Sequence, residues 1–200
     1  MNIAVFVSGN GSNLQALIDA QEHGVIGSGR ITLVVCDKPA AYALTRAEKH
    51  GIPVFVLEGS GFSSRDEYDK KVMKRLEEKS IELVVLAGFM RILSASFIDR
   101  YRNRILNIHP SLLPDFKGAH GIKDAYEAGV KVTGVTVHFV TEKLDSGPVI
   151  HQSRVEIDET DTLGSLEEKI HKEEHKLYPE AVRLFAEGRL LVEGDKVTVT

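Results

Sequence analysis

The chain has 200 residues, 42% of them hydrophobic and 27% charged, and its formal net charge at pH 7 is −4. This length and composition are typical of a folded protein with one substantial core, and they argue against an intrinsically disordered chain. A small negative charge without blocks of like charges disfavours general electrostatic binding to nucleic acid or to an anionic membrane.

Cys36 is the only cysteine, so no disulfide can form within the chain. It lies in an apolar run, which favours a core residue in a reducing compartment. The N-terminal stretch "MNIAVFVSGNGS" lacks a basic region followed by a cleavable apolar core. No apolar stretch approaches the ~20 residues that span a bilayer. We therefore expect a cytoplasmic protein with no membrane segment.

The N-terminal half alternates predicted strands and helices. Apolar runs without polar alternation predict strands buried on both faces of a parallel sheet, at Ile3–Val7, Ile31–Cys36, Pro53–Leu57 and Ile81–Gly88. Helical segments lie between them, at Asn13–His23, Leu44–His50 and Ser64–Ser80, the last opening with a predicted capping box of Ser64 and Glu67. This alternation predicts an α/β protein of Rossmann-like, doubly wound type, with a mostly parallel central sheet and helices on both faces.

The C-terminal half has a different pattern. Mixed or alternating runs predict strands with one functional or wet face, at Ile105–His109, Gly134–Thr141 and Pro148–Ile157. A long helix is predicted over Leu163–Gly188, bent or restarted near Pro179, and a hairpin around Gly194-Asp195 follows it. Without repeats or linkers, residues 1–200 read as one continuous domain with two halves around a cleft.

A glycine loop, "SGNGSN" at Ser8–Asn13, follows the first strand and opens the first helix. Free N–H groups at the helix start favour a phosphate there, and Ser12 and Asn13 can donate to it. A dinucleotide site is the alternative, with Asp37 as the ribose acid, but Leu14 stands where that fingerprint needs a third small residue. A plain turn before a capped helix also stays open.

Asn107 and His109 share one face of a predicted strand, and Pro110 ends that strand. Both side chains therefore lie at the carboxyl end of a strand, where open α/β sheets bind ligands. Thr136 and His138 share a face of the next predicted strand, and Asp145 follows in a loop.

An Asn, a His and an Asp can together support acyl transfer without a protein nucleophile. The histidine exchanges a proton near neutral pH, a carboxylate beside it favours the imidazolium, and the amide donates to an oxyanion. No Gly-x-Ser-x-Gly elbow or Cys–His signature indicates a covalent intermediate. His138 and His151 raise a metal alternative, and His171 and His175 have i, i+4 spacing, but no metal-ligand motif accompanies any of them. We expect no metal.

Glu174 interrupts an apolar helical stripe, between Ile170 and Leu177. An inward-facing carboxylate needs a partner. Either it forms a buried ion pair or lies at a partly exposed edge, or it binds substrate hydroxyls.

Four segments together resemble the formyltransferase family. They are "SGNGSNLQALIDA", "AGFMRIL", "ILNIHPSLLPDFKG" and "GVTVHFVTEKLDSGPVI", and the resemblance covers essentially all of the chain. The "SGNGSN" loop narrows it to the glycinamide ribonucleotide branch. The resemblance implies a single formyltransferase domain over residues 1–200. Its N-terminal half would bind the ribonucleotide, and its C-terminal half would bind folate and carry the catalytic residues.

The resemblance also implies the roles of site residues. Asn107, His109 and Asp145 match the family's catalytic trio. The matching residues for the ribonucleotide are Gly11, Ser12, Asn13 and Glu174, and those for 10-formyltetrahydrofolate are Arg65, Met90, Arg91, Ile92, Leu93, Asn107 and Thr141. The implied reaction transfers a formyl group from the folate to the amine of glycinamide ribonucleotide in purine biosynthesis, and both partners are small molecules. We expect a monomer or a homodimer.

The segment Ser111–Lys131 resembles the family's mobile loop, expected to close over the reacting groups and exclude water. Gly121 and Ile122 replace residues that are polar in many relatives, which leaves the contacts of this loop open. A bend at Leu113-Pro114 is plausible.

Four other functions stay in view. A methionyl-tRNA formyltransferase would need a further carboxyl-terminal domain and a more basic surface, and a formyltetrahydrofolate hydrolase would carry an amino-terminal regulatory domain. A nucleotide-dependent oxidoreductase would use Gly9, Gly11 and Asp37. A non-enzymatic phospho-ligand sensor would keep the glycine loop without the chemistry.

Overall fold

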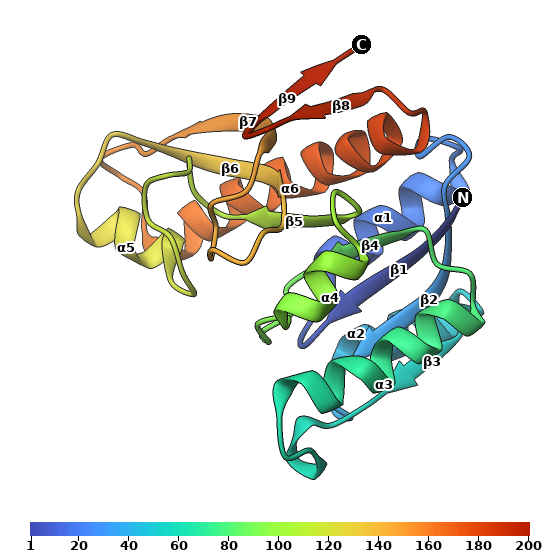
Figure 1. Ribbon diagram of the computed structural model, residues 1–200. Coiled ribbons are helices and arrows are strands. Elements are labelled where there is room, and N and C mark those ends of the chain that lie inside the picture. The colour runs from blue at the N-terminus through green and yellow to red at the C-terminus, as the bar shows by residue number, and fades with distance from the viewer.

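A seven-stranded sheet runs through the centre of the protein (Figure 1), in a computed structural model that describes residues 1–200. Its strands lie in the order β3-β2-β1-β4-β5-β6-β7. Their bounds are β1 Asn2–Val7, β2 Arg30–Cys36, β3 Val54–Val56, β4 Leu83–Leu86, β5 Ile105–His109, β6 Val132–Phe139 and β7 Val149–Glu156. The first five strands pair in parallel, whereas β6 and β7 pair antiparallel. The predicted α/β class with a mostly parallel sheet is confirmed.

Helices cover both faces of this sheet, as the sequence predicted. Their bounds are α1 Ser12–Glu22, α2 Tyr42–Lys49, α3 Arg65–Glu78, α4 Ala95–Arg100, α5 Gly121–Glu127 and α6 Leu163–Ala186. Buried side chains of α1, α2 and α6 join one core cluster, and those of α3 and α4 join the other. A short 3-10 turn at Gly59–Gly61 precedes α3, and the hairpin of β8 Leu190–Glu193 and β9 Lys196–Val199 ends the chain.

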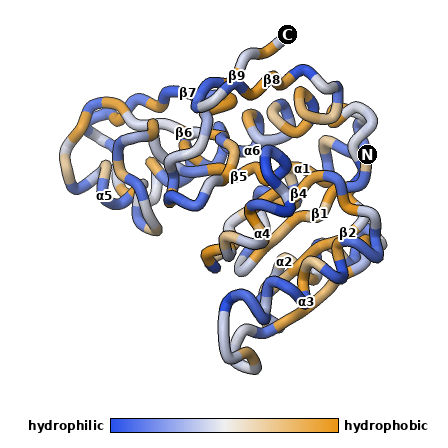
Figure 2. Tube along the Cα trace, in the orientation of Figure 1, coloured by the Kyte–Doolittle hydropathy of each residue, from blue (hydrophilic) through white to orange (hydrophobic).

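Strand β1 shows why the N-terminal apolar runs lack alternation. Ile3, Val5 and Val7 point into one core cluster, while Ala4 and Phe6 point into the other. Figure 2 accordingly draws β1 almost entirely in hydrophobic colours, whereas the solvent-facing α3 is mixed. A strand buried on both faces needs an apolar residue at every position. Cys36 is fully buried as well, which confirms its place in the core.

Helix α6 continues through Pro179, so the predicted restart there is wrong. The first four N–H groups of a helix have no intrahelical acceptor in any case. A proline further along the helix removes one backbone hydrogen bond, while the neighbouring residues keep theirs. In α6 that ladder extends over 24 residues and its inner face is buried against the sheet. Packing of this face outweighs the local loss, because tertiary contacts supply most of the stability of a protein helix.

The Tyr178 side chain joins α6 to the middle of the sheet. Its hydroxyl lies 2.8 Å from the Leu86 carbonyl oxygen on β4 and 3.1 Å from the Leu106 carbonyl oxygen on β5. One O–H shared between two carbonyls fixes the helix against both strands. Complete burial raises the pKa of this phenol well above its ordinary value, so it remains a donor at every physiological pH.

Three other local expectations need correction. The segment Ser111–Lys131 is not all loop, because α5 lies within it. Strand β6 begins at Val132 rather than Gly134 and is buried on both faces. Val135, Val137 and Phe139 join the core cluster that includes α6, and Thr136 and His138 on the other face are also buried. Helix α4 was not predicted, because its six residues are too few for a clear period.

The capping box at the start of α3 forms only in part. The Ser64 hydroxyl accepts the Glu67 N–H at 3.1 Å, as predicted. The Glu67 carboxylate instead accepts the N–H and the hydroxyl of Ser63, at 2.9 and 2.7 Å. Two donors on one residue explain that preference, and they lower the pKa of Glu67.

Candidate active site

Strand β5 presents Asn107 and His109 at its carboxyl end, and the strand has the predicted bounds. The antiparallel register with β6 places Asn107 opposite His138 and His109 opposite Thr136. Residues opposite each other in such a pair have neighbouring side chains on the same face. Four polar side chains of β5 and β6 therefore lie next to one another on one face of the sheet.

His138 fixes the orientation of the Asn107 amide. The His138 Nδ1 lies 2.8 Å from the Phe139 carbonyl oxygen, which can only accept, so Nδ1 carries the proton. The other nitrogen, Nε2, then accepts a hydrogen bond from the Asn107 Nδ2 at 3.2 Å. Burial lowers the pKa of His138, which keeps the ring neutral at pH 7. One amide hydrogen of Asn107 is thus held, and the other remains for a ligand.

Asp145 faces both histidines from the loop between β6 and β7. Its Oδ2 lies 3.6 Å from His109 Nδ1, and its Oδ1 lies 3.9 Å from His138 Nε2. The carboxylate is 9% exposed and His109 is 4% exposed. Asp145 has a φ of 46°, a left-handed backbone conformation that non-glycine residues adopt where surrounding structure fixes them. The predicted trio therefore lies together, with His109 and Asp145 buried and Asn107 half-buried and joined to them through His138.

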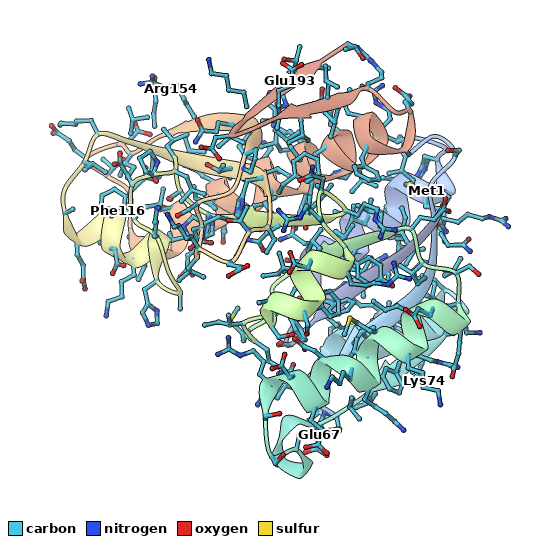
Figure 3. The ribbon with its side chains drawn as sticks, viewed as in Figure 1. Met1, Glu67, Lys74, Phe116, Arg154 and Glu193 are labelled. Carbon is cyan, nitrogen blue, oxygen red and sulfur yellow. The ribbon has the colours of Figure 1, made fainter.

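The segment between β5 and α5 lies over this cluster. His109 Nε2 donates to the Phe116 carbonyl oxygen at 2.8 Å, and the Gly118 N–H donates to Asp145 Oδ2 at 2.8 Å. A Cβ at Gly121 would lie 3.2 Å from His109 Nε2, so the glycine permits this close approach. Figure 3 labels Phe116 in this segment, beside α5. We call residues 111–121 the lid segment.

The glycine loop leaves the start of α1 open. Gly11 is the N-cap, with a φ of 77°, and it offers no side-chain hydrogen bond to the helix. The first N–H groups of α1 therefore have no acceptor within the helix and no side-chain cap, and such groups can donate to an anion. Leu14, the misfit in the dinucleotide fingerprint, is fully buried and packs in the core.

Glu174 reaches the glycine loop from α6 and is 4% exposed. Its Oε2 accepts from Asn13 Nδ2 at 3.0 Å and lies 2.9 Å from His171 Nδ1. The partner of this buried carboxylate is therefore an amide together with a half-exposed histidine, whose pKa the hydrogen bond raises. The two predicted ribonucleotide elements, the loop and Glu174, are in direct contact.

The predicted folate residues Met90–Leu93 follow β4 and adjoin the glycine loop. The Met90 N–H donates to the Ser8 hydroxyl at 2.9 Å. Met90 and Ile92 are 70% and 56% exposed, which is unusual for apolar side chains. The Arg91 guanidinium lies 4.1 Å from the centre of the Tyr68 ring. This segment therefore exposes the Met90 and Ile92 side chains, while Ser8 and Tyr68 hold its backbone and its Arg91 side chain.

The other two predicted folate residues lie at separate positions. Arg65 is the first residue of α3, and Thr141 follows β6, with its hydroxyl 3.3 Å from the Lys143 carbonyl oxygen. Neither residue forms a hydrogen bond or an ion pair with Met90–Leu93.

Two polar residues of the cluster were absent from the predicted site. His138 holds Asn107, and the Thr136 hydroxyl donates to the Ser111 carbonyl oxygen at 2.7 Å while accepting the Leu113 N–H at 3.1 Å. Thr136 therefore anchors the start of the lid segment. The sequence signal that could have identified Thr136 and His138 was their alternation on one face of an apolar strand. Its meaning depended on the β5–β6 register, which local sequence does not give.

No group of three or more His, Cys, Asp or Glu side chains is arranged to hold a metal ion. No helix combines the length and the apolar character that crossing a membrane requires.

Taken together, the fold and the site define a class: an α/β protein with an Asn–His–Asp cluster at its strand ends and a glycine loop beside it. The formyl transferase family model matches residues 1–182. The chain belongs to the formyl transferase family.

Individual relatives are similar over most of this chain. A phosphoribosylglycinamide formyltransferase of Escherichia coli is 45% identical over 190 residues, which cover 95% of this chain and 89% of that one. The trifunctional purine biosynthetic protein adenosine-3 of Gallus gallus is 46% identical over 98% of this chain, which spans only 20% of that relative. The crystal structure of glycinamide ribonucleotide transformylase 1 from Symbiobacterium toebii superposes with a TM-score of 0.97 at 45% identity, covering 100% of this chain and 93% of that one.

Proposed function

We propose that this protein transfers the formyl group of 10-formyltetrahydrofolate to the primary amine of glycinamide ribonucleotide, a step in purine biosynthesis. The observation that carries the proposal is the cluster of half-buried Asn107 with buried His109 and Asp145, together with the glycine loop that follows β1 of the same sheet. Relatives that bear the name phosphoribosylglycinamide formyltransferase support it.

The catalytic cluster suits direct attack of the amine on the formyl carbon. The free Asn107 amide hydrogen and protonated His109 would donate to the oxyanion that develops on the formyl oxygen. Asp145 faces His109 Nδ1 at 3.6 Å and would hold the ring while a proton moves to the departing folate nitrogen. The cluster contains no serine or cysteine nucleophile, so this path needs no covalent intermediate with the protein.

The glycine loop and Glu174 suit the ribonucleotide. The N–H groups at the start of α1 would bind the phosphate, where the helix dipole favours negative charge. Glu174, one turn of α6 away from Tyr178, would accept from the ribose hydroxyls, and Asn13 already orients this carboxylate at 3.0 Å.

The segment Met90–Leu93 suits the folate. Exposed Met90 and Ile92 would pack against the flat pterin ring, while the Met90–Ser8 hydrogen bond keeps this surface next to the ribonucleotide. Arg65 and Thr141 would contact other parts of the folate.

The lid segment must leave His109 before transfer. The Phe116 carbonyl oxygen accepts the hydrogen bond from His109 Nε2 that the formyl oxygen would need to accept. Substrate binding would replace this contact, and the segment would then close over the reacting groups and exclude water.

The test is an absorbance assay of tetrahydrofolate release from the 10-formyl cofactor, with and without glycinamide ribonucleotide. Release that requires the ribonucleotide and yields its formyl derivative is the expected result. Release without it would indicate a hydrolase instead. Absence of release, with both ligands shown to bind, would mean that the site is right and the reaction wrong, and a parallel nicotinamide nucleotide titration tests the oxidoreductase alternative.

A further inference from the structure

Arg46 of α2 binds Asn10, which lies in the middle of the glycine loop. Its Nε donates to the Asn10 carbonyl oxygen at 2.9 Å, and its Nη2 donates to Asn10 Oδ1 at 3.0 Å. The third guanidinium nitrogen, Nη1, lies 3.3 Å from Gln15 Oε1 on α1. The planar fork of an arginine can hold two oxygens of one residue in fixed geometry, which a lysine cannot do.

This contact acts where the chain has the greatest conformational freedom. Asn10 lies between Gly9 and Gly11, and glycines leave a loop many accessible backbone states. A second tie from α2 is the Ala43 N–H, which donates to the Gly9 carbonyl oxygen at 3.1 Å. Arg46 itself is braced by the Tyr42 ring, at 4.9 Å from the ring centre. Together these contacts hold Gly9 and Asn10 in the loop conformation that precedes the uncapped start of α1.

A cavity of about 380 Å³ opens beside the loop, and Arg46 forms part of its wall. The cavity is lined by Ser12, Gln15, Ala16, Asp19, Arg46 and His175. The guanidinium therefore also brings a positive charge to the place where an anion would meet the N–H groups of α1.

We propose that Arg46 is a positioning residue for phosphate binding: it holds Asn10, and through it the glycine loop, in the conformation that receives the ribonucleotide phosphate. The inference rests on the proposed function for the identity of the phosphate ligand. It concerns binding and not the transfer step, because Arg46 contacts neither Asn107, His109 nor Asp145.

Steady-state kinetics of Arg46→Met and Arg46→Lys test this role. For Arg46→Met we expect the KM for glycinamide ribonucleotide to rise about tenfold, as for loss of hydrogen bonds to a charged group. Its kcat should stay within about twofold, and the KM for the folate should not change. Arg46→Lys keeps the charge without the fork and should restore only part of the loss.

Arg104→Met is a matched control. Arg104 is likewise half-buried, lies 4.9 Å from the centre of the Tyr101 ring, and donates to a backbone carbonyl, that of Arg100, at 2.7 Å. It does not touch the glycine loop, so its substitution should leave the ribonucleotide KM unchanged.

Calorimetric titration with ribose 5-phosphate separates this inference from the proposed reaction. Weaker binding by about tenfold in Arg46→Met supports the inference even if the unaltered protein proves not to transfer formyl groups. Three results would overturn it: no binding of ribose 5-phosphate by the unaltered protein, full recovery in Arg46→Lys, or a parallel loss of kcat and of affinity for both substrates.

Discussion

The glycine loop and the catalytic cluster occupy the same edge of the sheet but differ in how their polar groups are used. At the glycine loop, the N–H groups at the start of α1 have no side-chain cap, and the loop is held by side chains of α2 and α6. In the catalytic cluster, the lid segment already occupies hydrogen-bonding positions of His109 and Asp145.

This difference implies that phosphate binding at the loop and activation of the cluster for transfer are separate steps. In the proposed reaction, a phosphate would enter the open loop with little change in the protein, whereas a formyl oxygen would have to displace the Phe116 carbonyl from His109. An exchange of one hydrogen bond for another costs little net free energy, but it couples reaction to lid movement. Substitutions at the loop should therefore change affinity, and substitutions in the cluster should change turnover.

The largest expected effect is on turnover, in Asp145→Asn and Asn107→Ala. Each should reduce kcat by about 10² or more, as does loss of one oxyanion donor, while thermal unfolding shows an intact fold. Asp195→Asn, in the turn of the β8–β9 hairpin, is the control and should be unaffected. Near-normal turnover in either cluster variant would defeat the catalytic assignment.

Gly11→Ala should primarily weaken ribonucleotide binding. The φ of 77° disfavours alanine, and the new Cβ would lie 2.6 Å from the Ala43 Cβ. Strain of about 1–3 kcal/mol should raise the ribonucleotide KM about tenfold and lower the melting temperature. Gly9→Ala is the control, because nothing lies within 4 Å of a Cβ there. Equal KM values for the two variants would contradict the required loop conformation.

A fall in pH should reduce both turnover and stability, because it protonates His138. Burial holds the pKa of His138 below its ordinary 6.5, so its stabilising neutral form is complete above pH 6.5 and is lost as pH falls through the lowered value. Protonated Nε2 can no longer accept from Asn107. The unfolding free energy should fall as pH drops from 6.5 through the lowered value, and kcat should fall roughly tenfold over the same range. His138→Gln, whose carbonyl accepts without titrating, should flatten this dependence, and an unchanged profile would count against it.

The smallest effect concerns His171 and has the opposite pH sign. Its hydrogen bond with Glu174 raises the pKa of His171, so the stabilisation is complete below pH 6.5 and is lost as pH rises through the raised value. Because the ring is half-exposed, His171→Gln should cost less than about 1 kcal/mol at pH 6 and nothing at pH 9. Urea unfolding at both values measures this, and a difference that grows with pH would refute it.

Local sequence predicted the parts of the fold that depend on local pattern. The bounds of β5, the shared face of Asn107 and His109, and the inward position of Glu174 all follow from periodicity of 2 or 3.6 residues. Asn107, His109 and Glu174 therefore lie on the strand and the helix where the sequence placed them, and their roles stay predictions.

The parts that could not be predicted depend on contacts between distant segments. His138 enters the cluster only through the β5–β6 register, and Phe116 contacts His109 through a backbone carbonyl that any residue would supply. Arg46 is one of many charged residues on an ordinary amphipathic helix, and only the tertiary structure shows that it meets Asn10. Periodicity carries no information about such pairings.

The spacing of Glu174 and Tyr178 on α6 has a consequence for changes in chain length. The first residue reaches the glycine loop and the second binds carbonyls of β4 and β5, one helical turn, or about 6 Å, further along. Each inserted or deleted residue turns the remainder of a helix by about 100°. A substitution at Lys176, the one exposed residue between the two, should be tolerated, whereas a single insertion there would turn one of these side chains away from its partner.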